Sequence, residues 1–406
     1  MAKAKTTPFA GFTPNGTEMP EWYSDKLGLS TAETGDLPSL ASLVGVNEDG
    51  EPTGEGGILA GVKGVTPGYK DEETGEWVEV HDKQAVINPE WEGDGLNNTQ
   101  RGHALWQFAS DRYTPVPPSG LLGPAVPVAV REDLTTFGVV EEYRMGGEVH
   151  VTMVMPDFRY EVGEAEYVLT YTAGYSHFGD QSLYYEVGAI NAETGVETHL
   201  TERETCPHRG DARHKVAAWW ESAFANAEDA TDSLGSVMRE AMDYMVPLKG
   251  GSGEEGNPMP YNLTGFYEGL GFPDGLAEAA AGHVKEVNTA GAEPETATAL
   301  ALYEGIATAL TEDIEIKTGG YQIRDHNKRA NKLLFSPPSA EAQVINYWQT
   351  QLAEQETLGL EERTAKKALG ERYGDTQAAI EHYTETKRQL KDILKEAKAS
   401  NGEAGA

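Results

Sequence analysis

Alternation of apolar and polar residues marks strands through the middle of the chain. Every second residue from Val149 to Met155 is apolar and falls on one face, while His150, Thr152 and Val154 fall on the other. The same period of two predicts further strands at 124–130, 137–143, 165–175, 183–190 and 196–200. Met145–Glu148 contains two glycines and predicts a hairpin tip. We therefore expect a central, mostly antiparallel sheet.

Shorter elements precede this sheet, and helices follow it. Apolar runs between Gly61 and Ile87 predict short strands with a hairpin turn at Asp71–Gly75, and Thr99–Ser110 reads as a short helix. After Asp211 the apolar spacing changes to three and four residues. That spacing predicts a helix or helix pair up to Pro247 and further helices near 274–287, 294–312 and 321–335. The fold class expected is α+β, with helices packed on the sheet.

The two ends of the chain are expected to differ from this core, which spans 61–335. Residues 1–60 are rich in Gly, Pro, Thr and acids and read as an extended arm, pinned by Trp22 and Tyr23. Residues 339–398 read as a helical appendage with a near-heptad run from Ile380, which suggests self-association through 340–398. Within it, 369–380 fits either the centre of a helix-turn-helix or a plain helical hairpin. The tail 399–406 is expected to be disordered.

Charge changes this picture more than any motif. The chain has 66 Asp and Glu against 32 Lys and Arg, a formal net charge of −34, with the acids spread along its length. It also has 7 Trp, 18 Tyr and 10 Phe, which favours a folded protein over an acidic disordered one. Such self-repulsion is costly in dilute buffer and is screened in brine. We expect a protein of an extreme halophile, in a high-salt cytosol or a virion.

Several classes of protein are excluded or disfavoured. One cysteine excludes a disulfide framework and a zinc site built from cysteines. The first residues lack the apolar core of a secretion signal, and no run of about 18 apolar residues predicts a membrane span. We expect no membrane association.

A cluster near the only cysteine could bind a metal. Cys206, His208 and His214 lie within nine residues, and thiolate and imidazole are good ligands. No acidic residue at a familiar spacing completes the set, so a structural turn before a helix is the favoured interpretation. We expect no metal, no cofactor and no catalytic residues.

Two sets of residues suggest contact with nucleic acid. Tyr171, Tyr175 and His177 could stack on bases, although tyrosines half-buried in a sheet are also common. Basic residues gather at 203–215 and 317–332, in a chain that is otherwise acidic. Pairing with acidic neighbours would explain these clusters equally well. The residues we expect to contact phosphates are Arg209, Arg213, Arg324, Lys328 and Arg329.

A series of short motifs resembles a known family. The motifs are DRYTPVP (111–117), GGEVHVTMVMP (146–156), SHFGDQS (176–182), RETC (203–206), ETATALALYEGIATAL (295–310) and KRANKLL (328–334). In order and rough spacing, residues 105–335 are similar to the phage/plasmid-like proteins grouped as domain of unknown function 932. That resemblance implies a mobile-element context and no particular activity.

These observations favour one function and leave two alternatives. We expect a non-catalytic virus or plasmid protein that binds single-stranded DNA in replication or recombination. The first alternative is a virion structural or assembly protein, such as a capsid or tail component. The second is a hydrolase or nuclease whose site the sequence does not identify, because acidic residues are too numerous for a catalytic pair to stand out.

Overall fold

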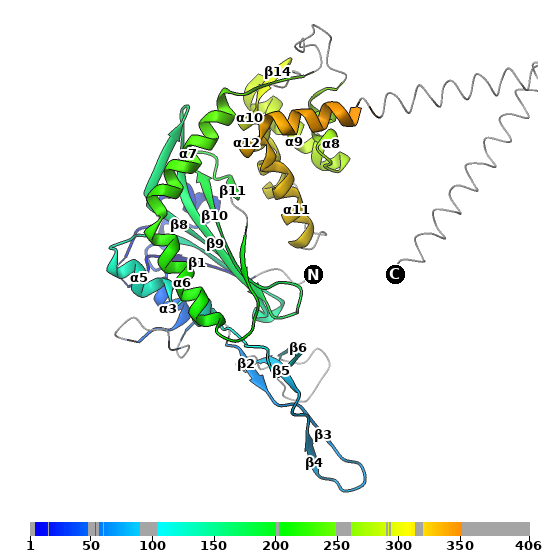
Figure 1. The fold of residues 1–406 in the computed structure, drawn as a ribbon. Helices are drawn as coiled ribbons and strands as arrows, with labels where there is room; N and C mark the ends of the chain where they lie inside the picture. The colour runs from blue at the N-terminus through cyan, green and yellow to red at the C-terminus, as the bar shows by residue number, and fades with distance from the viewer. Residues whose placement is uncertain are drawn as a thin grey trace, which may run out of the picture.

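The chain forms a curved sheet with helices on one face and at one end (Figure 1). This computed structural model describes residues 5–14, 16–47, 53, 57–59, 61–89, 104–199, 203–248, 261–289, 291, 294–312, 320–348 and 350. The architecture confirms the expected α+β class. Among the helices of these residues, none has the length and apolar character needed to cross a membrane.

Seven antiparallel strands make the main sheet. They are β1 (Lys5–Ala10), β7 (Phe137–Tyr143), β8 (Glu148–Val162), β9 (Ala165–Ser176), β10 (Leu183–Asn191), β11 (Glu197–His199) and β12 (Glu204–Cys206). The order is β1-β7-β8-β9-β10-β11, and β12 also pairs with β10. The expected antiparallel sheet is confirmed, and the turn η1 (Arg144–Gly146) lies at the hairpin tip that the glycines predicted.

The apolar face of the main sheet packs against two helices, α6 (Ala212–Ala225) and α7 (Ala227–Asp243) (Figure 1). Val149, Val151 and Met153 are buried on this face, as the alternation predicted. The Trp220 indole N–H donates to the Leu121 carbonyl oxygen at 2.7 Å. The large Trp220 side chain therefore fills this interface while its polar atom remains hydrogen-bonded. The helical backbone is interrupted at Asn226, so the predicted helical stretch is a pair of helices.

Residues 5–47 differ from the extended arm that we expected, because they belong to the core. Strand β1 pairs with β7 along the edge of the main sheet. Helices α1 (Glu21–Lys26), α2 (Thr31–Thr34) and α3 (Leu40–Val44) follow it. Phe9 and Leu40 are fully buried, and Tyr23 packs on Phe137 with ring centroids 5.1 Å apart. The apolar residues of 5–47 are too widely spaced to form a helix or strand period. The prediction of an extended arm, which was based on composition, was therefore wrong for this segment.

Two short segments have the opposite secondary structure from the one predicted. Residues 104–110 form strand β6 (Ala104–Ser110) rather than the end of a helix, because they pair with β5 (Lys83–Asn88). The expected strand at 124–130 is helix α5 (Ala125–Arg131), which follows α4 (Pro118–Leu121). Pro124 and Pro127 stand at its N-cap and in its first turn, where a missing N–H costs no hydrogen bond.

A separate set of strands extends away from the main sheet (Figure 1). Strands β2 (Lys63–Val65), β5 and β6 form a three-stranded sheet, and β3 (Gly68–Lys70) pairs with β4 (Trp77–Glu79) as a hairpin. The strands predicted between 61 and 87, and the turn at Asp71–Gly75, are confirmed. We call the part formed by β2 to β6 the projection.

A group of helices closes the other end of the sheet (Figure 1). They are α8 (Leu263–Gly269), α9 (Asp274–Thr289), α10 (Ala299–Glu312), α11 (Gly320–Ala330) and α12 (Lys332–Phe335), with the two-stranded pair β13 (Met245–Pro247) and β14 (Thr296–Thr298). Residues 337–348 are helical, and the Trp348 N–H donates to the Gly265 carbonyl oxygen at 2.9 Å. The predicted helix-turn-helix, the heptad run and the tail lie outside the described residues.

The tight pairing of β10 with β11 gives a test of the fold. A Cβ at Gly188 would collide with the Thr198 carbonyl oxygen, whereas one at Gly282 on α9 would meet open space. We expect Gly188→Ala to lower the free energy of unfolding by about 1–3 kcal/mol. Gly282→Ala should raise it by about 0.5–1 kcal/mol, because alanine favours the helix. Urea unfolding at high salt measures both, and a neutral Gly188→Ala would contradict the register.

Candidate functional site

The residues predicted to stack on bases are inside the protein. Tyr171, Tyr175 and His177 are all fully buried. The Tyr171 hydroxyl donates to the Ala223 carbonyl oxygen at 2.6 Å, and the His177 ring stacks on Trp106 with centroids 5.5 Å apart. Because other side chains cover these rings, a base cannot reach them without opening the core. The stacking prediction is therefore wrong for these three residues.

The candidate metal ligands do not converge. Cys206 is buried and its thiol contacts the Pro207 carbonyl oxygen at 3.5 Å. His208 is buried and stacks on Tyr113 with centroids 4.9 Å apart, while His214 is exposed on α6. Within the described part of the chain, no group of three or more His, Cys, Asp or Glu residues is placed to hold a metal ion. Cys206 ends strand β12, and residues 207–211 lead from it into α6.

The second basic cluster is only partly visible. Lys317 and the side chain of Arg324 lie outside what the structure describes. Lys328 is exposed on α11, and the Arg329 guanidinium donates to the Gly271 carbonyl oxygen. Lys332 donates to the Gln343 side chain at 2.8 Å. Arg329 and Lys332 therefore tie helices together, which favours the structural interpretation of this cluster.

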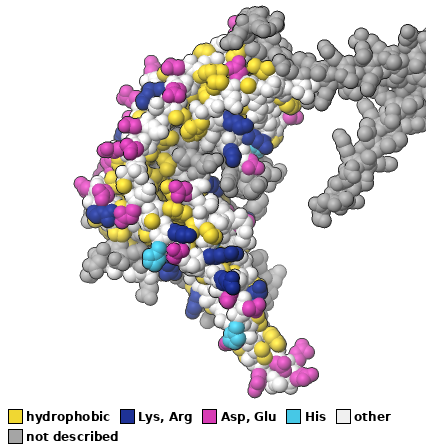
Figure 2. Space-filling view, in the orientation of Figure 1, with side chains coloured by type: hydrophobic (Ala, Val, Ile, Leu, Met, Phe, Trp, Pro, Cys, Tyr) yellow, Lys and Arg dark blue, Asp and Glu magenta, His cyan; other side chains and the backbone are white. Residues whose placement is uncertain are grey.

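The first basic cluster lies where the projection joins the main sheet. Arg209 forms an isolated antiparallel bridge with Tyr113, which places 206–213 beside 111–115. Arg209, Arg213 and Arg112 are exposed there. Arg213 and Lys63 line a cavity of about 410 Å³ at this junction. Figure 2 shows Lys and Arg side chains gathered over the same region.

The hairpin of the projection holds a tryptophan flat against its surface. The Trp77 ring covers Gly68, where a Cβ would collide with the indole, and Lys70 is its cross-strand partner. Gly68 is thus what allows the ring to lie across the neighbouring strand. The other side of the ring faces outward, since Trp77 is 63% exposed. A flat indole beside a lysine is a suitable surface for stacking a base.

The three-stranded sheet of the projection repeats this combination. Phe108 is 63% exposed and lies opposite Ala85 in the β5–β6 ladder. Lys83 is two residues along β5, so its side chain lies on the same face as Phe108. The Lys63 side chain lies on the same face, because Lys63 in β2 pairs with Ile87, which is four residues along β5 from Lys83. The outward face of this small sheet therefore presents an aromatic ring between lysines.

The cations of the projection and its junction differ from several others in the chain in their ion pairing. Five cations on or beside the main sheet have a carboxylate partner, in the pairs Lys5–Glu142, Lys26–Glu197, Arg144–Glu148, Arg159–Glu166 and Arg203–Glu186. No salt bridge to a described residue is formed by the exposed cations of the projection and its junction. We define the projection surface as these cations with the two rings: Lys63, Lys70, Trp77, Lys83, Phe108, Arg112, Arg209 and Arg213.

A second polar region lies on the face of the main sheet opposite α6 and α7. Glu186 is buried there and binds the Arg203 guanidinium at 2.7 Å and the His199 ring at 3.2 Å. Burial alone would raise the pKa of the Glu186 carboxyl, but His199 and Arg203 outweigh it and lower the pKa to about 2. The buried carboxylate is therefore ionised and paired on both sides.

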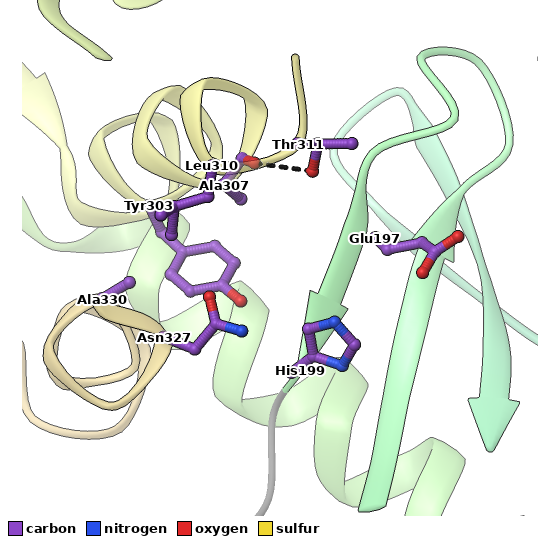
Figure 3. Close-up of a pocket in the computed structure, with 8 residues that line it drawn as sticks. All are labelled: Glu197, His199, Tyr303, Ala307, Leu310, Thr311, Asn327 and Ala330. Atoms are coloured by element: carbon purple, nitrogen blue, oxygen red, sulfur yellow. Dashed lines mark hydrogen bonds between the residues drawn. The ribbon is translucent and has the colours of Figure 1, made fainter. Parts of the chain in front are cut away.

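His199 also lines a small cavity between β11, α10 and α11 (Figure 3). The cavity measures about 60 Å³, which suits a few water molecules. The Tyr303 and Asn327 side chains point toward His199, while the Glu197 carboxylate points away from them (Figure 3). That carboxylate instead pairs with Lys26 at 2.8 Å.

A carboxylate, an imidazole and a phenol continue this polar region. His150 contacts the Tyr184 hydroxyl at 2.6 Å through Nδ1 and Glu148 at 3.0 Å through Nε2. The Arg203 guanidinium lies over the Tyr184 ring, 3.9 Å from its centroid. Such a row can pass a proton, but Tyr184 is buried and out of reach of an outside reactant. We read the row as groups that satisfy one another inside the sheet.

Sequence reasoning named Arg209 and Arg213 but missed the rest of the projection surface. Trp77 and Phe108 were counted only as members of a strand and of a presumed helix. The available signal was the hairpin turn at Asp71–Gly75, which pairs Lys70 with Trp77 and leaves Gly68, two residues along the strand, with no side chain to keep the ring away. Comparison of the chain with models of known families, with curated proteins and with solved structures found no match.

Three histidines give a test of these environments. Burial lowers the pKa of His177 to about 3, with His208 adding to the shift, and burial lowers the pKa of His208 to about 4. For His199, burial opposes the charge but Glu186 overcomes it and raises the pKa. NMR titration of the ring resonances should therefore separate His199 from the other two.

The same shifts set the sign of the pH dependence of stability. The contribution of His177 and His208 to the free energy of unfolding is fully present above their ordinary pKa near 6.5. That contribution is lost as pH falls toward about 3–4. His199 has the opposite sign, with its contribution present below 6.5 and lost as pH rises through its raised pKa. Titration of His177 near 6.5 would contradict its burial.

Proposed function

We propose that this protein binds single-stranded DNA without catalysis, through the projection surface. The observation that supports this most directly is a group of exposed rings on the projection, chiefly Trp77 and Phe108, set among cations that lack a carboxylate partner in the described structure. Bases of a single strand are free to stack on such rings, whereas bases of a duplex are already stacked on each other. The proposal keeps Arg209 and Arg213 from the sequence prediction and replaces the buried tyrosines.

Salt decides which contacts supply the affinity. The net charge of −34 suits molar salt, where the Debye length is about 3 Å. Attraction between phosphates and lysines is then weak beyond direct contact. Stacking, which contributes about 1–3 kcal/mol per base, does not depend on charge and would provide most of the binding free energy. The cations would act at contact distance, positioning the backbone.

The biological setting belongs to the same proposal. A protein of a virus or plasmid of an extreme halophile would meet single strands during replication or recombination. That setting rests on the acidic composition and on the resemblance of residues 105–335 to phage/plasmid-like proteins.

A second candidate function is assembly of a virus particle. The projection also exposes apolar side chains with no base-stacking geometry, chiefly Leu105 at 47% and Val78 at 37%. Exposed apolar residues on an extended element suit contact with another protein copy. The test below distinguishes the two functions, because DNA binding and self-association respond to different measurements.

The experiment measures the affinity of the protein for a labelled oligothymidylate of about 20 nucleotides by fluorescence anisotropy, in about 2 M KCl. Trp77→Ala and Phe108→Ala should each cost about 1–3 kcal/mol of binding free energy, which is about 5- to 150-fold in Kd. Replacing Lys83, Arg112 and Arg209 together by Gln should weaken binding several-fold, more at lower salt.

Matched variants control for general effects. Tyr347→Ala removes an exposed ring elsewhere, and the triple change of Arg131, Arg159 and Lys215 to Gln removes exposed cations that are ion-paired. Neither should alter the affinity. Absence of saturable binding, or equal loss in test and control variants, would overturn the proposal. Self-association in sedimentation that is lost in Leu105→Ser would then favour assembly.

A further inference from the structure

A ligand-sized cavity lies at the end of the main sheet that the helices close. Its volume is about 400 Å³, and its walls come from the β8–β9 turn, the β10–β11 turn and helices α7, α9 and α10. Pockets for small organic molecules in proteins begin at about 300 Å³. Most of the wall is apolar, with Val162, Val196, Met242, Val284, Val287 and Leu300. Val287 is 81% exposed, so the cavity opens to solvent beside it.

Among the carboxyl groups of the described lining residues, that of Glu304 is the least exposed. The Tyr167 hydroxyl donates to Glu304 Oε1, and the Asn191 side chain also lies against this carboxyl. Burial raises the pKa of the Glu304 carboxyl, although both of these donors oppose the rise. Glu304 is partly buried and forms no salt bridge with a residue that the structure describes, whereas the buried acids Glu142 and Glu186 both have cationic partners.

The charges around the cavity all have one sign apart from a histidine. Glu164 and Glu193 line it together with Glu304. Of the lining residues that the structure describes, His283 and Tyr167 are the other titratable ones, and none is a lysine or arginine. An anionic ligand would be repelled here, and a neutral one would leave the buried carboxylate without a counter-ion. A cation with an apolar body satisfies both the carboxylate and the walls.

We propose that this cavity binds a small organic cation, an ammonium group attached to an alkyl or similar apolar body. The ammonium would contact Glu304, held in place by Tyr167 and Asn191, and the apolar body would lie along the walls toward Val287. Binding favours the ionised carboxylate, so a proton leaves Glu304 when the cation enters below its raised pKa. The inference is independent of DNA binding, because the cavity shares no residue with the projection surface.

The experiment titrates the full chain at constant high salt with n-hexylammonium chloride and follows binding by calorimetry. Hexylammonium should bind more tightly than hexan-1-ol or hexanoate at equal chain length, because only it pairs with Glu304. Affinity should rise about fourfold for each methylene from ethylammonium to hexylammonium, as the walls bury the chain. Shifts of the His283 and Val284 resonances in NMR would place the ligand in this cavity.

Two variants and one control test the assignment. Glu304→Gln should lower the affinity for hexylammonium at least tenfold and leave that for hexan-1-ol within about twofold. Ala301→Leu, which adds apolar bulk to the cavity and leaves the charge of Glu304 in place, should weaken both ligands. Glu278→Gln removes an exposed acid from α9 and should change neither. Equal binding of hexylammonium and hexanoate, or full affinity in Ala301→Leu, would overturn the proposal.

Discussion

The pairing of β8 with β9 is the constraint on which the rest of the structure depends. These strands run for 15 and 12 residues, and their register puts Val149 opposite Tyr175 and Met153 opposite Tyr171. A slip by one residue would turn His150 and Thr152 toward α6 and α7 and the valines toward the polar face. In the observed register, the apolar face of the sheet packs against the helices, and the opposite face holds the Glu186 and Glu148 networks.

Charge is arranged around that sheet in two ways. On or beside the main sheet five cations face a carboxylate, so the excess of acids is partly neutralised at contact distance. The projection differs, because its exposed lysines and the junction arginines have no such partner within the described residues, although the chain carries a net charge of −34. In brine this difference acts only at short range. A surface that combines these cations with Trp77 and Phe108 is therefore suited to contact, and poorly suited to long-range steering.

The sequence predicted elements with a clear period and failed where tertiary pairing decided the outcome. Strands β7 to β10 and the helices after Asp211 followed from spacing alone, whereas the order of the strands came only from the structure. Residues 104–110 became a strand because β5 offered a ladder, and 5–47 joined the core through a few separated residues such as Phe9 and Leu40. Residues two apart in a strand share a face, so Tyr171 and Tyr175 lie on the same face of β9 as the apolar residues Leu169 and Ala173. The sequence therefore already indicated that these two tyrosines are on the apolar face. Exposure of Trp77 could not be predicted, since it depends on how far the projection extends from the sheet.

The central claim is that the projection surface contacts the bases of single-stranded DNA. Photocrosslinking tests it most directly, with 5-iodouracil placed along an oligonucleotide and the modified residues located by mass spectrometry. We expect crosslinks at Trp77 and Phe108 that disappear when unlabelled single strands compete. Crosslinks confined to the helical end of the molecule, or none above the level given by free iodouracil, would contradict it.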